Sequence, residues 1–264
     1  MAKKSGQARV PTLEAQRRLF DAIQEHRHPE KNTAIMRISF CLGLRVQEIS
    51  LLQLKEVCKL APFKVDQSRD FKLYEVMSLP AAYTKGANAL KRSRSEYKRT
   101  KISFTVTEFE RVVQQIEKLA KAGADINATD FHPDLVSHKG KSRDLPMVDE
   151  SLRQALIDYI EVRLAKDPSA LPSDPLFITQ KGGSYSPNTL QEHMALMLRD
   201  WAGIEKATSH SGRRTLLTDI IQNQNEGLKV AQLVAGHVSP ATTVIYSQPT
   251  EKAVSRALKN RSKE

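Results

Sequence analysis

Apolar residues recur every three or four positions along much of the chain, which is the spacing of amphipathic helices. Thr12 is suited to cap the first of these runs, and His28-Pro29 ends it. A second helix is expected at about 32–41, followed by a break at Gly43 and a buried face over 46–52. Further helices are expected at about 107–122, 149–165, 187–202, 212–224, 228–236 and 251–259.

Strand-like apolar runs are fewer and shorter. They fall at 73–79, 102–106, 135–137, 144–147 and 176–179, and Gly182-Gly183 is expected to form a turn. The runs at 135–137 and 144–147 flank Lys139-Gly140-Lys141, a short turn that suits a hairpin. The pattern therefore predicts an α+β fold that is mainly α-helical with a small antiparallel β-sheet.

Charge adds a first indication of the partner. The chain has 264 residues, and its 41 Lys and Arg outnumber 30 Asp and Glu, which gives a formal net charge of +11. An excess of this size favours a polyanionic partner, because a protein that neutralises phosphates releases their condensed counterions. Charge alone is explained equally well by a basic protein with a solvated surface.

The basic residues are concentrated in one segment. Residues 85–101 contain one acidic residue, Glu96, and seven basic ones: Lys85, Lys91, Arg92, Arg94, Lys98, Arg99 and Lys101. Such a run is usually a mobile solvated loop. Contact with DNA phosphates has equal weight here, since little else in this region explains the concentration of charge.

Cysteine content and hydropathy bear on the compartment. Cys41 and Cys58 are too few for a disulfide framework and are not spaced as metal ligands, which favours a reducing, cytoplasmic location. The basic arm at 1–11 has no apolar segment behind it, and no stretch approaches the roughly 20 apolar residues that span a bilayer. We therefore expect a soluble protein without a membrane partner.

Three short motifs contain the residues of chemical interest. The first, at 43–48, includes Arg45; the second, at 210–215, includes His210 and Arg213; the third is Gly236-His237, followed nine positions later by Tyr246. Each motif has an ordinary explanation when it is taken singly. Arginine three residues before a glutamate is typical of a helix-surface ion pair, a histidine near a helix end interacts with the dipole, and a tyrosine on an apolar strip packs in a core.

Together these residues describe a site for phosphate chemistry. Two arginines supply planar forks that match phosphate oxygens, two histidines supply donors or a proton shuttle, and the tyrosine supplies an oxygen nucleophile. No cluster of acidic residues of the two-metal kind stands near the motifs, and no phosphate-binding glycine-rich loop is present. The set therefore predicts a reaction at a phosphate without a metal or other cofactor.

The order of the motifs resembles the active-site signature of the tyrosine recombinase (phage integrase) family. The likeness extends to the surrounding text at 12–60 and 134–258, including Pro-Leu-Phe-Ile-Thr before Gly-Gly-Ser-Tyr-Ser-Pro. The resemblance implies a site-specific DNA recombinase that cleaves and rejoins double-stranded DNA through a covalent 3′-phosphotyrosine. It implies that Tyr246 is the nucleophile and that Arg45 and Arg213 clamp the scissile phosphate. It also implies that His210 and His237 hydrogen-bond the phosphate and help to transfer protons.

The same resemblance implies a lysine in a hairpin turn as the general acid for the leaving 5′ oxygen. Lys139 is the first choice. The family's turn often reads Lys-x-x-Lys-x-Arg, and the turn His138–Arg143 is one residue shorter. Lys141 in the same turn and Lys85, which opens the charged segment, are the alternatives.

The resemblance also sets expectations for organisation. We expect the basic arm at 1–11 and a catalytic domain at 12–264, with an insertion at about 62–133, a C-terminal tail at 249–264 and no separate N-terminal core-binding domain. Family members pass such a tail to a neighbouring subunit, although a helix folded back on its own domain fits equally well. Assembly into a tetramer on DNA and accessory DNA-bending proteins are the implied partners.

Two other functions share parts of this pattern. A type IB topoisomerase would use the same chemistry to relax DNA as a monomer, but the text around His210 and His237 is integrase-like. A catalytically silent DNA-binding module would keep the motifs without activity. The complete set of five residues argues against that alternative.

Overall fold

The computed structural model describes residues 8–64, 68–80, 83, 90–91, 106–125, 136–137, 142–223, 227–237 and 239–247. The chain divides into two compact units. The larger unit comprises 1–78 and 143–264, and the smaller comprises 79–142. The basic arm up to residue 7, the C-terminal tail and most of the segment 85–101 lie outside the described residues.

The N-terminal helices of the larger unit begin at the predicted signals. In α1 (Leu13–Gln24) the Thr12 hydroxyl accepts a hydrogen bond from the Ala15 amide at 3.2 Å, which caps the helix as predicted. Helix α2 (Pro29–Arg37) begins at the proline, three residues earlier than expected, because proline is well suited to a first helical turn. It continues as a π-helical turn, η1 (Ile38–Leu42), which ends at Gly43 with a positive φ of 62°.

Two short helices follow the break at Gly43. They are α3 (Val46–Leu51) and α4 (Leu54–Val57), and each has a glutamate at its third position that accepts a hydrogen bond from the backbone amide before the helix. Ile49 and Leu52 are fully buried, as predicted, but Leu51 is 41% exposed. The buried face is therefore narrower than expected.

The strands form two-stranded sheets with unexpected partners. The predicted strand at 73–79 falls in two elements, β2 (Arg69–Leu73), which pairs antiparallel with β1 (Cys58–Phe63), and β3 (Val76–Leu79), which pairs with β6 (Arg143–Pro146). In the smaller unit, β5 (Val136–Ser137) pairs with β4 (Leu90–Lys91). The predicted hairpin between 135–137 and 144–147 is therefore wrong, because each run pairs with an earlier segment rather than with its neighbour.

The longest described element of the smaller unit is α5 (Val106–Lys121). The helix matches the prediction for 107–122, whereas Val106 is helical and not part of a strand; the other residues of that predicted strand lie outside the described residues. From Glu110 to the end of α5 no side chain is buried. Within the described residues, this helix has no core of its own.

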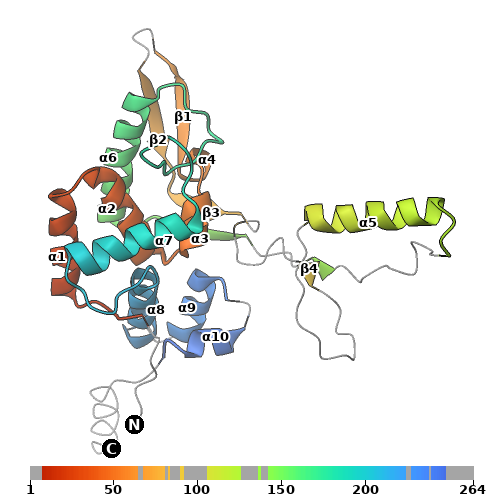
Figure 1. Cartoon of the computed structure of the whole chain (residues 1–264). Helices are drawn as coiled ribbons and strands as arrows, with labels where there is room; N and C mark the ends of the chain where they lie inside the picture. The colour runs from red at the N-terminus through yellow and green to blue at the C-terminus, as the bar shows by residue number, and fades with distance from the viewer. Residues whose placement is uncertain are drawn as a thin grey trace, which may run out of the picture. The chain divides into compact units, whose positions relative to one another are not determined.

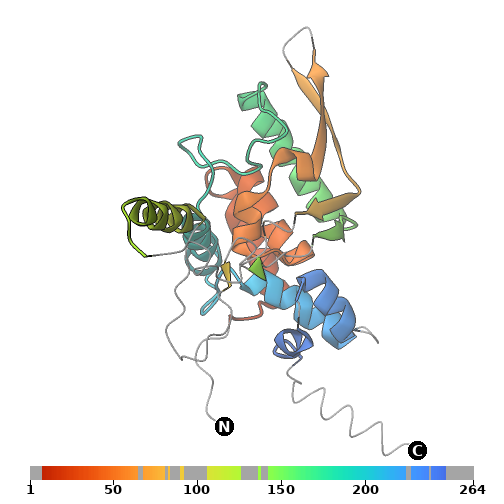
Figure 2. The ribbon, with the colours of Figure 1, turned by 90° about the vertical axis from the view of Figure 1, so that its right-hand side faces the viewer.

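Helix α6 (Glu150–Lys166) packs against α2 and β2 in the larger unit (Figures 1 and 2). The Asp149 carboxylate caps it by accepting a hydrogen bond from the Leu152 amide at 2.9 Å. The predicted strand at 176–179 is wrong, since this segment has only isolated bridges, one between Ile178 and Ser184. The apolar run reflects burial rather than a strand, since Leu176 is fully buried. Its amide donates to the Leu52 carbonyl and is not part of a strand ladder.

Three of the remaining helices match the predicted ranges closely. They are α7 (Pro187–Leu196) with its π-helical continuation η4 (Met197–Trp201), α8 (Ser211–Asn223) and α9 (Gly227–Ala235). A short helix, α10 (Pro240–Val244), was not predicted, and the helix predicted at 251–259 lies outside the described residues. Helices α8, α9 and α10 lie together, in blue in Figure 1, and α8 also packs against η1. The predicted fold class, mainly helical with small antiparallel sheets, is confirmed.

Candidate active site

Arg213 joins two distant segments of the larger unit. It lies in the first turn of α8, and only 2% of its surface is exposed. Its Nη1 donates to the Gly43 carbonyl at 2.5 Å, and its Nη2 donates to the Ala235 carbonyl at 2.8 Å. Burial, and then the charge of Arg45, lower the pKa of Arg213, but a guanidinium stays protonated at neutral pH.

The end of α9 fixes the position of His237. Gly236 has a φ of 60° and donates its amide to the Leu233 carbonyl, while the His237 amide donates to the Gln232 carbonyl. This pair of bonds is a Schellman motif, in which glycine supplies the left-handed residue after the helix. The motif therefore turns the chain so that His237 leaves the helix beside Arg213.

His237 is a neutral imidazole with an assignable tautomer. Its Nε2 lies 3.0 Å from Arg213 Nη2 and its Nδ1 lies 2.9 Å from Thr243 Oγ1. Burial lowers the pKa of His237 to about 4, and the charges of Arg213, Arg45 and Arg143 act in the same direction. Because a guanidinium can only donate, Nε2 is the acceptor, and the proton is on Nδ1.

Tyr246 lies two residues after the end of α10. Its amide donates to the Thr243 carbonyl at 3.0 Å, and its ring packs on the apolar cluster formed by α8 and α9. The ring also stacks on His237, with centroids 5.8 Å apart and planes 19° from parallel. Thr243 is fully buried, so a single hydroxyl helps to orient His237 one turn before the candidate nucleophile.

Arg45 enters the same site from the start of α3. Its Nη1 forms an ion pair with Glu48 Oε1 at 2.9 Å, and 22% of its side chain is exposed. Glu48 Oε2 accepts a further bond from the Arg45 amide at 2.7 Å. Glu48 is fully buried, which makes it an unusual partner for an exposed helix-surface pair and shows that the ordinary explanation of these two residues does not hold.

Arg143 is a third arginine in this network, and the sequence motifs did not single it out. It is the first residue of β6, and its Nη2 forms an ion pair with Glu48 Oε2 at 2.7 Å. Its Nη1 donates to the Ala235 carbonyl at 3.0 Å, the same oxygen that Arg213 holds. Burial lowers the pKa of Arg143, and Glu48 opposes that effect.

The available signal for Arg143 was its place in the turn motif. It stands where the family's Lys-x-x-Lys-x-Arg turn has its arginine, three residues before Pro146. Thr243 had no signal beyond its position three residues before Tyr246. Both residues act through contacts that span parts of the chain or one helical turn, which a list of motifs does not contain.

The structure thus brings Arg45, Arg213, His237 and Tyr246 into one network. His210 is exposed in the turn that enters α8, where its carbonyl accepts the Arg214 amide and its own amide donates to Thr208 Oγ1. Lys139, Lys141 and Lys85 lie outside the described residues. So do the predicted DNA-binding residues of the basic segment, apart from the backbone of Lys91 in β4.

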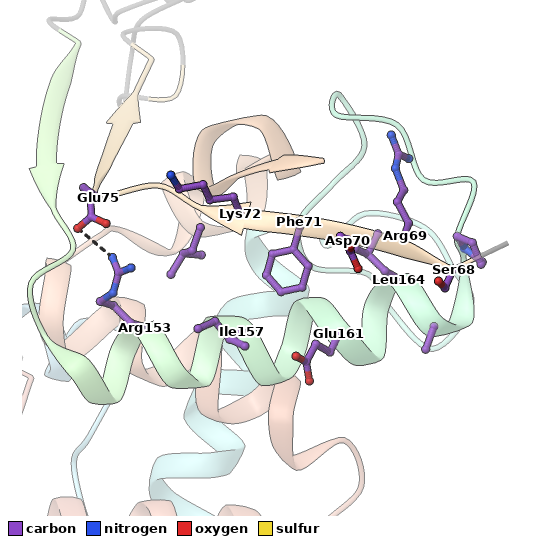
Figure 3. Close-up of a pocket in the computed structure, with 13 residues that line it drawn as sticks. Ser68, Arg69, Asp70, Phe71, Lys72, Glu75, Arg153, Ile157, Glu161 and Leu164 are labelled. Atoms are coloured by element: carbon purple, nitrogen blue, oxygen red, sulfur yellow. Dashed lines mark ion pairs between the residues drawn. The ribbon is translucent and has the colours of Figure 1, made fainter. Parts of the chain in front are cut away.

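A cavity of about 990 Å³ lies between β2 and α6, where Figure 3 shows Phe71 and Leu164 between charged side chains. An ion pair between Arg153 and Glu75 at 3.5 Å closes one end. None of the candidate catalytic residues lines this cavity.

The described residues contain no group of three or more His, Cys, Asp or Glu side chains placed to hold a metal ion. Among the same residues, no helix combines the length and the apolar character needed to cross a bilayer.

Two solved structures share the fold of this chain. The chain superposes on XerA recombinase with a TM-score of 0.58 and 19% identity, covering 97% of this chain and 66% of that one. It superposes on the Tn1549 transposon integrase in complex with transposon right end DNA with a TM-score of 0.58 and 16% identity, covering 99% and 68%. At these identities the likeness shows the fold.

Sequence relatives cover part of the chain. A tyrosine recombinase XerC of Methylobacterium sp. (strain 4-46) is 37% identical over 116 residues, which are 43% of this chain and 34% of the relative. A second XerC, from Bradyrhizobium diazoefficiens, is 30% identical over 116 residues, again 34% of the relative. The match therefore spans about a third of the length of these curated relatives.

The family assignment rests on a longer match. Residues 107–253, more than half of the chain, match the sequence model of the phage integrase family. The matched range contains His210, Arg213, His237 and Tyr246, whereas Arg45 precedes it. The chain belongs to the phage integrase family.

Proposed function

We propose that the protein is a site-specific DNA recombinase that cleaves and rejoins double-stranded DNA through a covalent bond between Tyr246 and a 3′ phosphate. The observation that carries the proposal is the network of Arg45, Arg213, His237 and Tyr246. These side chains come from three separated segments, and the buried Glu48 carboxylate pairs with Arg45. Membership of the phage integrase family supports the same function.

The charge of the network suits a phosphodiester. Arg45, Arg143 and Arg213 contribute three positive charges, Glu48 contributes one negative charge, and His237 is neutral. The excess of two positive charges exceeds the single charge of a phosphodiester and favours the additional charge of a pentacoordinate transition state. Donors preorganised for charge that develops in the transition state each contribute roughly 3–4 kcal/mol.

The proposed step conserves atoms and protons. The Tyr246 oxygen attacks phosphorus as the bond from phosphorus to the 5′ oxygen breaks, which leaves a 3′-phosphotyrosine and a 5′ hydroxyl. His237 Nε2 is unprotonated, and the ring stacks on Tyr246. A bound phosphate anion offsets the arginine charges that lower the pKa of His237, so Nε2 takes the phenol proton once a phosphate oxygen competes for Arg213 Nη2. His210 donates to the phosphate, and a lysine protonates the leaving oxygen. Reversal by another 5′ hydroxyl rejoins the strand without a cofactor.

The identity of the lysine is part of the proposal. The Ser78 hydroxyl donates to the Asp144 carboxylate and the Met147 amide donates to the Glu75 carbonyl, so β3 and β6 run antiparallel. The chain therefore leaves β3 and re-enters β6 at the same end of the pair. Lys85 follows Leu79 by six residues and Lys139 precedes Arg143 by four, so both lysines are close in sequence to that end of the pair. The pairing is therefore compatible with either lysine as the general acid, and we retain Lys139.

A sulfur leaving group separates the lysines. A substrate with sulfur in place of the bridging 5′ oxygen needs no proton donor, because a thiolate is a far better leaving group than an alkoxide. Lys139→Ala should lose cleavage of the oxygen substrate and regain it with the sulfur substrate. The same recovery in Lys85→Ala or Lys141→Ala, with a normal Lys139→Ala, would transfer the role.

The basic segment 85–101 is proposed to contact DNA phosphates. Each phosphate contact contributes about 0.9 to the slope of log binding constant against log salt concentration. Deleting 85–101 should therefore flatten that slope by several units. An unchanged slope would show that the segment is a bystander.

The assembly is also a proposal. Recombination of two duplexes requires four cleavages, so we expect four copies on DNA, with the tail 249–264 docked on a neighbouring copy and accessory proteins that bend the DNA. Crosslinking on a synapsed duplex should give tetramers. A truncation at 248 that still assembles would exclude the tail as the link.

The test of the central proposal uses a library of nicked duplexes, from which the 5′ fragment is lost after cleavage. The protein should become covalently attached, and the captured ends would identify the target sequence. Tyr246→Phe should bind DNA but form no covalent product. Tyr74→Phe, a change of the same kind at a partly exposed tyrosine in the larger unit, is the matched control. Covalent product from Tyr246→Phe would exclude this tyrosine as the nucleophile.

A further inference from the structure

Arg143 is the first residue of the larger unit after the segment 79–142 in the sequence, and its side chain is 8% exposed. Its Nη2 reaches Glu48 across 95 residues of sequence, and its Nη1 reaches Ala235 across 92. One guanidinium therefore joins the segment that carries Arg45 to the segment that carries His237.

The contact with Glu48 affects Arg45 directly. Glu48 Oε1 is bound by Arg45 Nη1, and Oε2 is shared by the Arg45 amide and Arg143 Nη2. A fully buried carboxylate with two cationic partners has little freedom, because each oxygen is held in a charge-assisted bond. Removing Arg143 leaves Oε2 with the Arg45 amide alone and lets the carboxylate, and with it the Arg45 guanidinium, reorient.

The contact with α9 affects His237 in the same way. The Ala235 carbonyl is at the C-terminal end of the helix, where the dipole favours cations, and it accepts bonds from both Arg143 and Arg213. Gly236 follows directly, and a Cβ at that position would overlap Arg143 Nη1. Arg143 therefore packs against the Schellman turn that directs His237.

We propose that Arg143 is a positioning residue for the phosphotyrosine reaction, which sets Arg45 and His237 relative to each other and anchors the root of β6 four residues after Lys139. The inference rests on the proposed function. Arg143 acts through other groups, since both of its terminal nitrogens are engaged by protein and its Nε is buried. No contact of Arg143 with the reacting phosphate is required.

The experiment measures the rate of covalent attachment at saturating protein on a captured nicked duplex, together with the DNA dissociation constant. Arg143→Ala should slow attachment about 100-fold and change the dissociation constant less than about threefold. Arg143→Lys should slow it about tenfold, because one ammonium cannot reach Glu48 and Ala235 as a fork does. Added guanidinium ion should accelerate Arg143→Ala in a saturable manner and leave the wild type unchanged.

Two controls separate positioning from stability. Arg153→Ala removes an arginine of the same unit that bonds to Glu75 and to the Tyr74 and Met147 carbonyls. None of these partners belongs to the candidate active site, so this variant should attach to DNA at the normal rate. The sulfur-bridged substrate should not rescue Arg143→Ala, because the defect is in the phosphate ligands. Full rescue would instead show that Arg143 positions only the lysine that protonates the leaving oxygen, and would overturn its proposed effect on Arg45 and His237.

The outcomes distinguish this inference from the proposed function. A wild-type protein that never becomes attached to DNA contradicts the function itself. If the wild type is attached and Arg143→Ala reacts at the normal rate, only the positioning role is wrong. If Arg143→Ala is unfolded by circular dichroism, Arg143→Lys decides: a normal rate overturns the proposal, and a slowed rate with unchanged melting temperature supports it.

Discussion

Two clusters of basic side chains are buried in the larger unit, and they hold their charge differently. Around Glu48, Arg45 and Arg143 bind the carboxylate, and Arg213 binds the helix-end carbonyls of Gly43 and Ala235. Around Lys31, which is 7% exposed, the ammonium donates to the Ile178 carbonyl at 3.1 Å and lies 5.4 Å from the centre of the Tyr185 ring. The neighbouring His193 bonds to Asn32 at 2.8 Å, and burial lowers its pKa to about 4.

The difference indicates which cluster is built for an anion. The Lys31 cluster holds a single ammonium beside a neutral histidine, and burial and then the nearby Lys166 lower the pKa of Lys31. Its cavity of about 420 Å³ has aromatic walls that include Trp201. The Glu48 cluster keeps an excess of guanidinium groups, which do not lose their protons at neutral pH. Burial of basic residues therefore does not by itself mark a phosphate site, whereas burial of arginines with too few carboxylates does.

The largest expected contrast is in catalysis. Arg213→Ala should reduce strand cleavage at least 100-fold, since it removes a preorganised donor from the phosphate. Lys31→Met, which removes the buried cation of the other cluster, should change cleavage less than about threefold. The measurement is the rate of covalent attachment to a nicked duplex under conditions where both variants are folded. A similar loss of attachment rate in the two variants would show that the two clusters do not differ in their role in catalysis.

The second contrast is in stability. Glu48→Gln leaves Arg45 and Arg143 without their carboxylate and should lower the free energy of unfolding by about 3–5 kcal/mol. Glu75→Gln breaks an ion pair whose carboxylate is 83% exposed and should change it by less than about 1 kcal/mol. Urea unfolding measures both. Added sulfate should stabilise Glu48→Gln more than the wild type, and equal stabilisation would show that the arginines do not bind an anion.

The smallest effect is in acid. The pKa of His193 is about 4 in the folded chain and about 6.5 when unfolded, so the unfolded chain takes up a proton first as the pH falls. The stability from neutral His193 is complete above pH 6.5 and declines toward pH 4. His193→Gln should flatten the decline by no more than about 3 kcal/mol, measured by urea midpoints at pH 7.5 and 4.5. A variant as acid-sensitive as the wild type would contradict the burial of a neutral imidazole.

The features that the sequence predicted best are local ones. Thr12, Asp149 and Pro187 mark helix starts because a cap or a fixed φ acts within one turn. Strands were predicted poorly because pairing is not local: β6 finds its partner 60 or more residues upstream, and the apolar run at 176–179 is buried by contacts with Leu52 rather than by a sheet. The π-helical end of α2 had no signal in the apolar pattern.

The site shows the same division. Residue types and spacing identified the four side chains that converge, because their chemistry is distinctive even without coordinates. The pattern did not reveal that Arg213 is almost completely buried, nor that Glu48 binds two arginines. These properties depend on the packing of α8 against η1 and on the position of β6, which no single motif specifies.

The close packing of Gly236 against Arg143 has an evolutionary consequence. A side chain at 236 would be strained by the positive φ and would also displace a guanidinium that is held at both ends. The two positions are therefore expected to covary across relatives, and a chain with a residue other than glycine before the histidine should lack an arginine at the start of the returning strand. The residue at the position of Gly236 would then indicate whether a homologue keeps the contacts of Arg143 with Glu48 and Ala235.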